Sequence, residues 1–235
     1  MPTFDRLPPI PPPPYEDWGS VSPPVDRGEE LADPTALSPK IRYDGSYAKQ
    51  GLAGAMEKCL VRETVARMLA EAAEELPGGY SILIFDALRP LSVQRAIYDS
   101  FKAQFLREKP DISSEELEAL LSDCVAKPVK RLERPAPHTT GGAVDLTLCK
   151  DGHPLDMGTG FDDLTHLAYT DALERDCPPG LTQARDNRRY LYRLMTAVGF
   201  VNYSCEWWHY AYGERQWAVR TGKVPFYGFR AECDN

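Results

Sequence analysis

The chain has 235 residues, with 27 Lys and Arg against 35 Asp and Glu, so its formal net charge is −8. This acidic balance argues against nucleic acid as a partner, because binding to phosphate backbones depends on clustered basic side chains. The hydrophobic content of 43% is typical of a globular protein, and no apolar run approaches the ~18 residues of a membrane span.

Export and a disulfide framework are not indicated either. Residues 1–14 lack a basic stretch followed by an apolar run, the pattern of a secretory signal. The six cysteines never form a CxxC pair, which argues against a zinc knuckle or a thioredoxin-type site. Reduced thiols are typical of the cytoplasm. We therefore expect a cytoplasmic protein that binds neither nucleic acid nor a membrane, and the sequence predicts no particular oligomeric state.

The first 40 residues differ in composition from the rest. They hold 11 of the 21 prolines, a density that favours extended polyproline II. Residues 12–15 match the PPxY pattern that some aromatic-grooved modules bind, although an arm that simply packs on the domain explains the same residues. We predict a proline-rich arm over residues 1–40 and one globular domain over residues 41–235. A single hydrophobic core can stabilise a domain of this length.

A helix followed by a strand is predicted next. Apolar residues recur at three- and four-residue spacing over 61–76, the pattern of one buried helix face. A Pro-Gly-Gly segment at 77–79 ends this helix. The run 80–85 is short, apolar and rich in β-branched residues, as strands are. Asp86 and Arg89 therefore follow directly on a strand.

The later elements alternate helices with short strands and lack a βαβ rhythm, which indicates a single α+β domain. Capping residues, hydrophobic periodicity and turn residues define them. They are a helix over 92–105, a helix opened by the capping box of Ser113 and Glu116, a basic proline-punctuated connection over 128–137, a half-buried strand over 143–148 and a helix over 187–198.

Two of the four histidines lie in unusual segments. His138 is followed by a glycine pair and, seven residues on, by Asp145 in the predicted strand. Glycines permit the tight reversal that brings two ligands to one point. In the second segment Glu206 and His209 lie three residues apart among bulky aromatic residues that can exclude water.

These residues match the needs of a metal hydrolase. Catalytic zinc takes three protein ligands, leaves one position for water and works beside a base. His138, Asp145 and His209 would supply the ligands and Glu206 the base. Hydrogen-bonded structural histidines, or a non-haem iron site with two histidines and a carboxylate, remain alternatives. On a straight strand Glu206 and His209 would point to opposite faces, so the site requires a turn or a bulge.

Three blocks carry a more specific pattern: Phe85-Asp-Ala-Leu-Arg-Pro, His138-x-x-Gly-x-Ala-x-Asp-Leu-Thr-Leu and Glu206-Trp-Trp-His-Tyr. In this order along the chain they resemble the signature blocks of the VanX-type D-alanyl-D-alanine dipeptidases. These zinc peptidases are related to the D-Ala-D-Ala carboxypeptidases and the hedgehog amino-terminal domain. The resemblance spans about residues 42–229 and implies a small antiparallel sheet with helices packed around it.

The resemblance also implies an activity and its residues. One Zn²⁺ per chain is bound by His138, Asp145 and His209, Glu206 is the general base, and Arg89 stabilises the oxyanion. The substrate implied is the small zwitterionic dipeptide D-Ala-D-Ala, hydrolysed to two D-alanines in peptidoglycan turnover, nutrient recovery or glycopeptide resistance.

Further positions bear on substrate binding. Asp86 is expected to orient Arg89, although its spacing also suits a surface ion pair. Asp162 lies in a segment similar to a family loop and is expected to bind the substrate ammonium. The family usually has serine two positions before the first histidine, where this chain has Ala136. The missing hydroxyl is expected to weaken dipeptide binding by ~1 to 3 kcal/mol. His153 and His166 are expected to lie outside the site.

Two other functions remain open at this point. A carboxypeptidase acting on longer cell-wall peptides would need an open cleft and usually export. A non-catalytic binding module that keeps the fold and zinc would need neither Glu206 nor Arg89. Because every block lies after Arg42, we expect deletion of residues 1–30 to spare zinc binding.

Overall fold

The computed structural model describes residues 7–128 and 132–230. Eight strands are assigned within these ranges: β1 Leu31–Ala32, β2 Ile41–Tyr43, β3 Val61–Arg62, β4 Tyr80–Asp86, β5 Ala143–Lys150, β6 His153–Pro154, β7 Val201–Asn202 and β8 His209–Ala211. The α-helices there are α1 Ser46–Lys49, α2 Glu63–Glu74, α3 Leu91–Glu108, α4 Ser114–Cys124, α5 Ala172–Arg175, α6 Thr182–Ala197 and α7 Arg215–Thr221. The 3-10 helices are η2 Pro34–Ala36, η3 Pro137–Thr140 and η4 His166–Ala168.

The central element is a sheet with the strand order β2-β4-β5-β8-β7, and β6 pairs with β5. Strand β2 runs parallel to β4 because the chain crosses between them through α2, and the other pairs are antiparallel. Strands β1 and β3 form a separate antiparallel pair. The prediction of a single α+β domain with a small, mainly antiparallel sheet and flanking helices is confirmed.

Strand β5 is buried along almost its whole length, from Ala143 to Cys149. The prediction of a half-buried strand is therefore wrong. The reason is its central position: Leu146 and Leu148 face the main core, while Asp145, on the opposite face, lines a pocket that other segments of the chain enclose. A charged side chain can be kept there because the neighbouring strands supply its partners.

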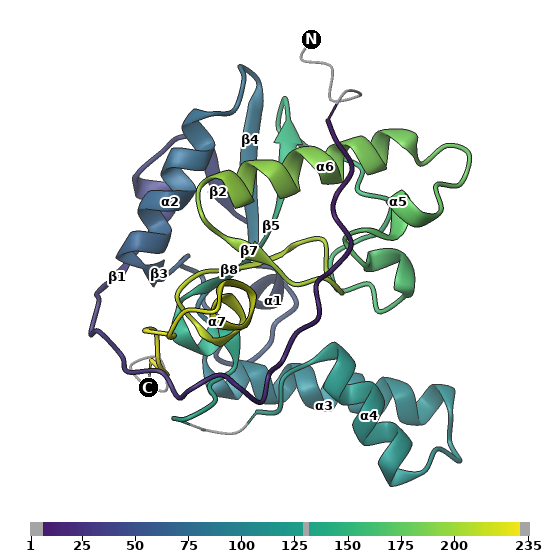
Figure 1. Ribbon diagram of the computed structural model, residues 1–235. Helices are drawn as coiled ribbons and strands as arrows, with labels where there is room; N and C mark the ends of the chain where they lie inside the picture. Colours follow the sequence, from purple (N-terminus) through teal and green to yellow (C-terminus); the bar gives the residue numbers. More distant parts are fainter. Residues whose placement is uncertain (1–6, 129–131, 231–235) are drawn as a thin grey trace.

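Two helices pack against the sheet in the main core (Figure 1). Helix α2 buries the predicted apolar face, but it begins at Glu63, because the two residues before it pair with β1 instead. Helix α6 begins at Thr182, five residues before the predicted start, and buries Leu191 and Met195. Both helices contribute to one cluster with the inward side chains of β4 and β5.

A second, smaller core joins α1, α3 and α4, which lie below the sheet in Figure 1. The predicted capping box is present: the Ser113 hydroxyl accepts from the Glu116 N–H, and the Glu116 carboxylate accepts from the Ser113 N–H, both at 3.2 Å. The short helix α7 was not predicted. Its cap, Glu214, belongs to a segment without strong helical periodicity.

The N-terminal segment runs in extended form across α6 and α7 (Figure 1). The Ile10 N–H donates to Glu174 at 3.1 Å, and Ile10 is buried. Arg193 of α6 donates to the carbonyl of Pro8. Arg220 of α7 pairs with Glu16 at 3.1 Å. The proline-rich segment therefore contacts the domain over much of its length.

No helix in the described ranges combines the length and the apolar character needed to cross a membrane. The cysteines whose side chains are described, Cys59, Cys149, Cys177 and Cys205, are free thiols. Cys233 and residues 129–131 of the predicted basic connection lie outside the described residues.

Candidate active site

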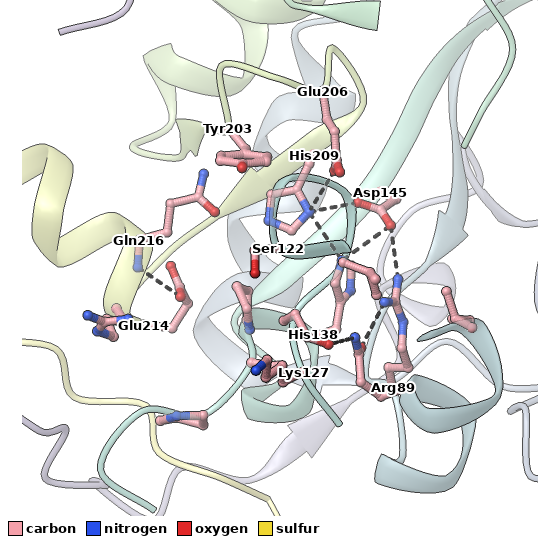
Figure 2. Close-up of a pocket in the computed structure, with 18 of the residues that line it drawn as sticks. Arg89, Ser122, Lys127, His138, Asp145, Tyr203, Glu206, His209, Glu214 and Gln216 are labelled. Carbon is pink, nitrogen blue, oxygen red and sulfur yellow. Dashed lines mark hydrogen bonds and ion pairs between the residues drawn. The ribbon is translucent and has the colours of Figure 1, made fainter. Parts of the chain in front are cut away.

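Two strands bring the first pair of predicted ligands together. Asp145 of β5 and His209 of β8 are direct register partners, so their side chains lie on the same face of the sheet. Asp145 Oδ1 is 2.9 Å from His209 Nδ1. His138 Nε2 completes the group, 3.2 Å from Asp145 Oδ2 and 3.2 Å from His209 Nδ1 (Figure 2). All three side chains are buried.

The glycine pair makes the chain reversal that brings His138 back to β5. Gly141 has φ 73°, and a Cβ at Gly142 would lie 2.6 Å from the Tyr212 carbonyl oxygen, so both positions favour glycine. The imidazole is oriented by Nδ1, which lies 2.8 Å from the Ala87 carbonyl oxygen. Because a carbonyl can only accept, Nδ1 carries the proton there, and the Nε2 lone pair faces the other ligands.

The three residues fit a metal ion by their donor set. One ligand atom from each lies within 4.8 Å of the others. Two imidazole nitrogens and one carboxylate, converging in a buried site, are donors that catalytic zinc and non-haem iron both use. Burial acts to raise the pKa of Asp145, but the two histidines outweigh it and hold that pKa well below its usual range. The carboxylate is therefore ionised, as a ligand must be.

Glu206 reaches the same point because the backbone turns before β8. The Glu206 N–H donates to Tyr203 O at 3.0 Å, and the chain enters β8 only at His209. This turn removes the difficulty that a straight strand would pose. Glu206 Oε2 is 3.8 Å from His209 Nδ1, and the Glu206 side chain is 23% exposed. Burial raises the pKa of Glu206 to about 8, and Asp145 adds to the shift although His209 opposes it.

Arg89 enters the site through a β-bulge. The register of β4 against β5 shifts between Ile84 and Asp86, which places Asp86 opposite Asp145. Arg89 Nε donates to Asp86 Oδ2 at 2.8 Å, and Nη2 lies 3.5 Å from Asp145 Oδ2. Both members of the Arg89–Asp86 pair are buried, so it is not a surface pair. Burial acts to lower the pKa of Arg89, but Asp86 outweighs it and raises that pKa, so the guanidinium stays charged.

Asp162 lies in the same pocket. Its backbone has φ 61°, a left-handed conformation that is uncommon outside glycine. Tyr47 donates its hydroxyl to the Asp162 carboxylate at 3.0 Å. Burial raises the pKa of Asp162 to about 7, and the charge of Asp145 adds to the shift. The neighbouring Phe161 stacks on Phe85 at 4.8 Å and forms part of an apolar wall.

The predicted site residues line one cavity of about 570 Å³ (Figure 2). Asp86 is the exception, since it contacts the cavity through Arg89. Ala136, the position that departs from the expected serine, also lines it. His153 and His166 are exposed and outside it, as predicted.

Sequence reasoning missed several residues of the cavity. Gln94 accepts from Arg89 Nη1 at 2.9 Å and donates to Ala126 O at 2.7 Å, so it fixes the guanidinium. Tyr203, Arg215 and Trp18 line the cavity from segments far apart in the chain. Gln94 lies on the helix after the Arg89 block, and Arg215 lies in the segment 212–218 near the end of the family resemblance. These positions were the available signals, and Tyr203 and Trp18 carried none.

Comparison with models of protein families matches residues 29–225 to the peptidase family M15, described as D-Ala-D-Ala dipeptidase. The chain belongs to the D-Ala-D-Ala dipeptidase family. The predicted family is thereby confirmed, and so is the prediction of a metallopeptidase.

Curated dipeptidases from several bacteria are similar to the chain. The D-alanyl-D-alanine dipeptidase of Synechocystis is 27% identical over 86% of this chain and 92% of that protein. The Escherichia coli dipeptidase is 28% identical, over 77% of this chain and 83% of that protein. The Streptomyces coelicolor dipeptidase is 34% identical, over 61% of this chain and 67% of that protein. Among solved structures, the D,D-pentapeptidase VanY in complex with Zn(II) is similar with a TM-score of 0.46 and 16% identity, covering 88% of this chain and 97% of that chain.

Proposed function

We propose that this member of the dipeptidase family hydrolyses D-Ala-D-Ala to two D-alanines with one zinc ion per chain. The observation that carries the proposal is the convergence of His138 Nε2, Asp145 and His209 Nδ1, with the Glu206 carboxylate 3.8 Å from His209. The names of the relatives, all D-alanyl-D-alanine dipeptidases, support the substrate.

In this proposal His138, Asp145 and His209 hold the zinc ion. When bound, zinc supplies a Lewis acid that polarises water and the scissile carbonyl. Glu206 accepts the proton of the attacking water and delivers it to the leaving amine. Arg89 donates a hydrogen bond to the oxygen that becomes negative.

Asp162 is the proposed partner of the substrate ammonium. Its carboxylate lies beside Arg89 and Tyr47, at the same end of the cavity as the ligand cluster. Only the N-terminal nitrogen of a peptide is an ammonium, because an amide nitrogen within the chain carries no positive charge. A substrate whose ammonium binds Asp162 therefore has no residue before that position. The placement therefore supports a preference for free dipeptides over longer substrates.

The metal requirement is tested in one preparation. We expect one equivalent of zinc per chain by elemental analysis and hydrolysis of D-Ala-D-Ala but not of L-Ala-L-Ala. Dialysis against a chelator should reduce hydrolysis to background, and added zinc should restore it. A protein that hydrolyses the dipeptide equally well without metal would contradict the proposal. Equal cleavage of a longer peptide ending in D-Ala-D-Ala would instead indicate a carboxypeptidase.

Replacement of Arg89 by lysine is expected to lower kcat by about 10²- to 10³-fold, with a smaller change in KM. The Arg89 guanidinium donates hydrogen bonds to Asp86 and Gln94. A lysine ammonium cannot make both of these bonds and also donate to the substrate. Steady-state kinetics measure the effect. Arg67→Lys, in an exposed pair with Glu63 on α2, is the control. An Arg89→Lys enzyme with full kcat would rule out the assigned role.

A further inference from the structure

The cavity extends well past the ligand cluster. Its volume of about 570 Å³ lies in the range of pockets for small-molecule ligands. Beyond His138 and His209 it is lined by Arg134, Arg215 and Gln216, which we call the basic end. Figure 2 shows Gln216 extending toward Tyr203 and His209, on the side away from Arg89.

The two ends of the cavity differ in charge. Around the ligand cluster, Asp145, Asp162 and Glu206 line the wall together with Arg89 and the two histidines. At the basic end, Arg134 has no acidic partner within the described ranges. A bound zinc ion would offset the carboxylates of the ligand cluster, whereas nothing among the described residues fully offsets the guanidinium groups at the basic end, so this end favours the carboxylate of a zwitterionic ligand.

The acid nearest to the basic end is already engaged. Glu214 is fully buried, and its two carboxylate oxygens accept the backbone N–H groups of Gln216 at 2.9 Å and Trp217 at 2.8 Å. Burial, and then the nearby charge of Arg134, lower the pKa of Arg215, and Glu214 opposes this only in part. Both guanidinium groups line the same cavity, so a bound anion would reduce the repulsion between their charges.

Arg215 is held in place by the N-terminal segment. Its Nη2 donates to the Trp18 carbonyl, and the guanidinium lies over the Trp18 ring at 5.3 Å from the centroid. Its Nε is buried and, among the described residues, has no hydrogen-bond partner. Gln216 is only 2% exposed, and its side-chain amide nitrogen likewise has no hydrogen-bond partner among the described residues. Two such buried donors in one cavity are costly unless a ligand or water accepts from them.

We infer that Arg215 and Gln216, with Arg134, form a subsite for the C-terminal carboxylate of the dipeptide. The inference rests on the proposed function, and it names the residues that fix the orientation of the substrate. Trp18 becomes a positioning residue, since it acts on the substrate through Arg215. Bidentate recognition of carboxylates is a favoured use of arginine.

The subsite is tested by direct binding to the zinc-loaded Glu206→Gln protein, which keeps the cavity but lacks the proposed base. Calorimetry compares D-Ala-D-Ala with its C-terminal amide. We expect an added Arg215→Gln substitution to weaken binding of the acid by about ten- to a hundredfold and to leave the amide unchanged. Arg215→Lys should recover part of the loss. Arg220→Gln is the matched control, because Arg220 lies on the same helix, pairs with Glu16 and does not line this cavity.

The outcomes separate the two proposals. An equal loss for the acid and the amide in Arg215→Gln, or the same loss in Arg220→Gln, would overturn the subsite while leaving the proposed function intact. Failure of the dipeptide and its amide to bind to the zinc-loaded Glu206→Gln protein with Arg215 in place would overturn the proposed function itself. Selective loss of the acid in Arg215→Gln alone supports both.

Discussion

Replacing Glu206 by glutamine is expected to lower kcat for D-Ala-D-Ala hydrolysis by about 10²- to 10⁴-fold, while the zinc content stays at one equivalent. Glutamine keeps the size of the side chain in the turn before β8 but cannot accept the proton of water. The ligands His138, Asp145 and His209 do not depend on Glu206 for their mutual contacts. Metal binding and catalysis should therefore separate in this variant.

Steady-state kinetics and elemental analysis of the same preparation measure both quantities. The matched control is Glu71→Gln, an exposed acid on α2, which should leave kcat and zinc content unchanged. Loss of zinc together with activity would show that Glu206 is a ligand, and full activity of the variant would rule out its role as base.

Replacing Asp26 by alanine is expected to lower the free energy of unfolding by about 3 kcal/mol, the lower end for breaking a buried ion pair. Its partner Arg62 is completely buried, so the variant leaves a buried guanidinium without its carboxylate. The lower value is chosen because Arg62 also donates to three carbonyls, and because the Asp26 side chain is 31% exposed. Urea denaturation measures the change.

The same contacts change what truncation should do. Arg62 Nε donates at 2.7 Å to the carbonyl of Thr140, which lies in η3 with His138. Deleting residues 1–30 removes Asp26 and the carbonyl of Glu29 that Arg62 also uses. In place of the sequence-based expectation that zinc binding is spared, we expect the truncated chain to be less stable and to bind zinc more weakly.

The pH dependence gives a second readout for Asp26→Ala. Burial acts to raise the pKa of Asp26, but the N–H groups of Gly28 and Gly228 and the charge of Arg62 outweigh it, so the pKa is lowered. A carboxyl with a lowered folded-state pKa stabilises the fold above its unfolded pKa, and this contribution is lost as the pH falls through the folded value. The stability difference should therefore persist at neutral pH and shrink below about pH 4.

The control for this prediction is Glu30→Ala. Glu30 lies in the same segment, but its side chain is 83% exposed in its ion pair with Arg230, so its removal should change stability by less than about 0.5 kcal/mol. Equal effects of Asp26→Ala and Glu30→Ala would contradict the account of Arg62.

Local patterns predicted the elements best where periodicity or capping is strong. The helix over 61–76, the strand over 80–85 and the capping box of α4 appear with small changes at their ends. The errors come from tertiary contacts. Residues 61–62 join a strand because β1 offers them a partner, and β5 is buried on both faces because the main core covers one face and the segments around the pocket cover the other.

The sequence by itself determined the chemical groups of the site. Residue type and spacing suggested His138, Asp145, Glu206 and His209, with a structural role or an iron site as alternatives, and the resemblance to the dipeptidase family added Arg89. Only the tertiary structure decided how these groups meet: the register of β5 with β8, the turn before β8 and the bulge in β4 each set one side chain in place.

The tertiary structure alone also decided the far end of the cavity and the role of the N-terminal segment. Trp18, Arg134 and Arg215 come from separate parts of the chain, and no local pattern predicts that they meet. The contact of Arg215 with Trp18 joins residues 197 positions apart, and no short-range signal encodes such a pairing. Long-range packing places these side chains around one cavity, because burial depends on the whole fold and not on neighbouring residues in the sequence.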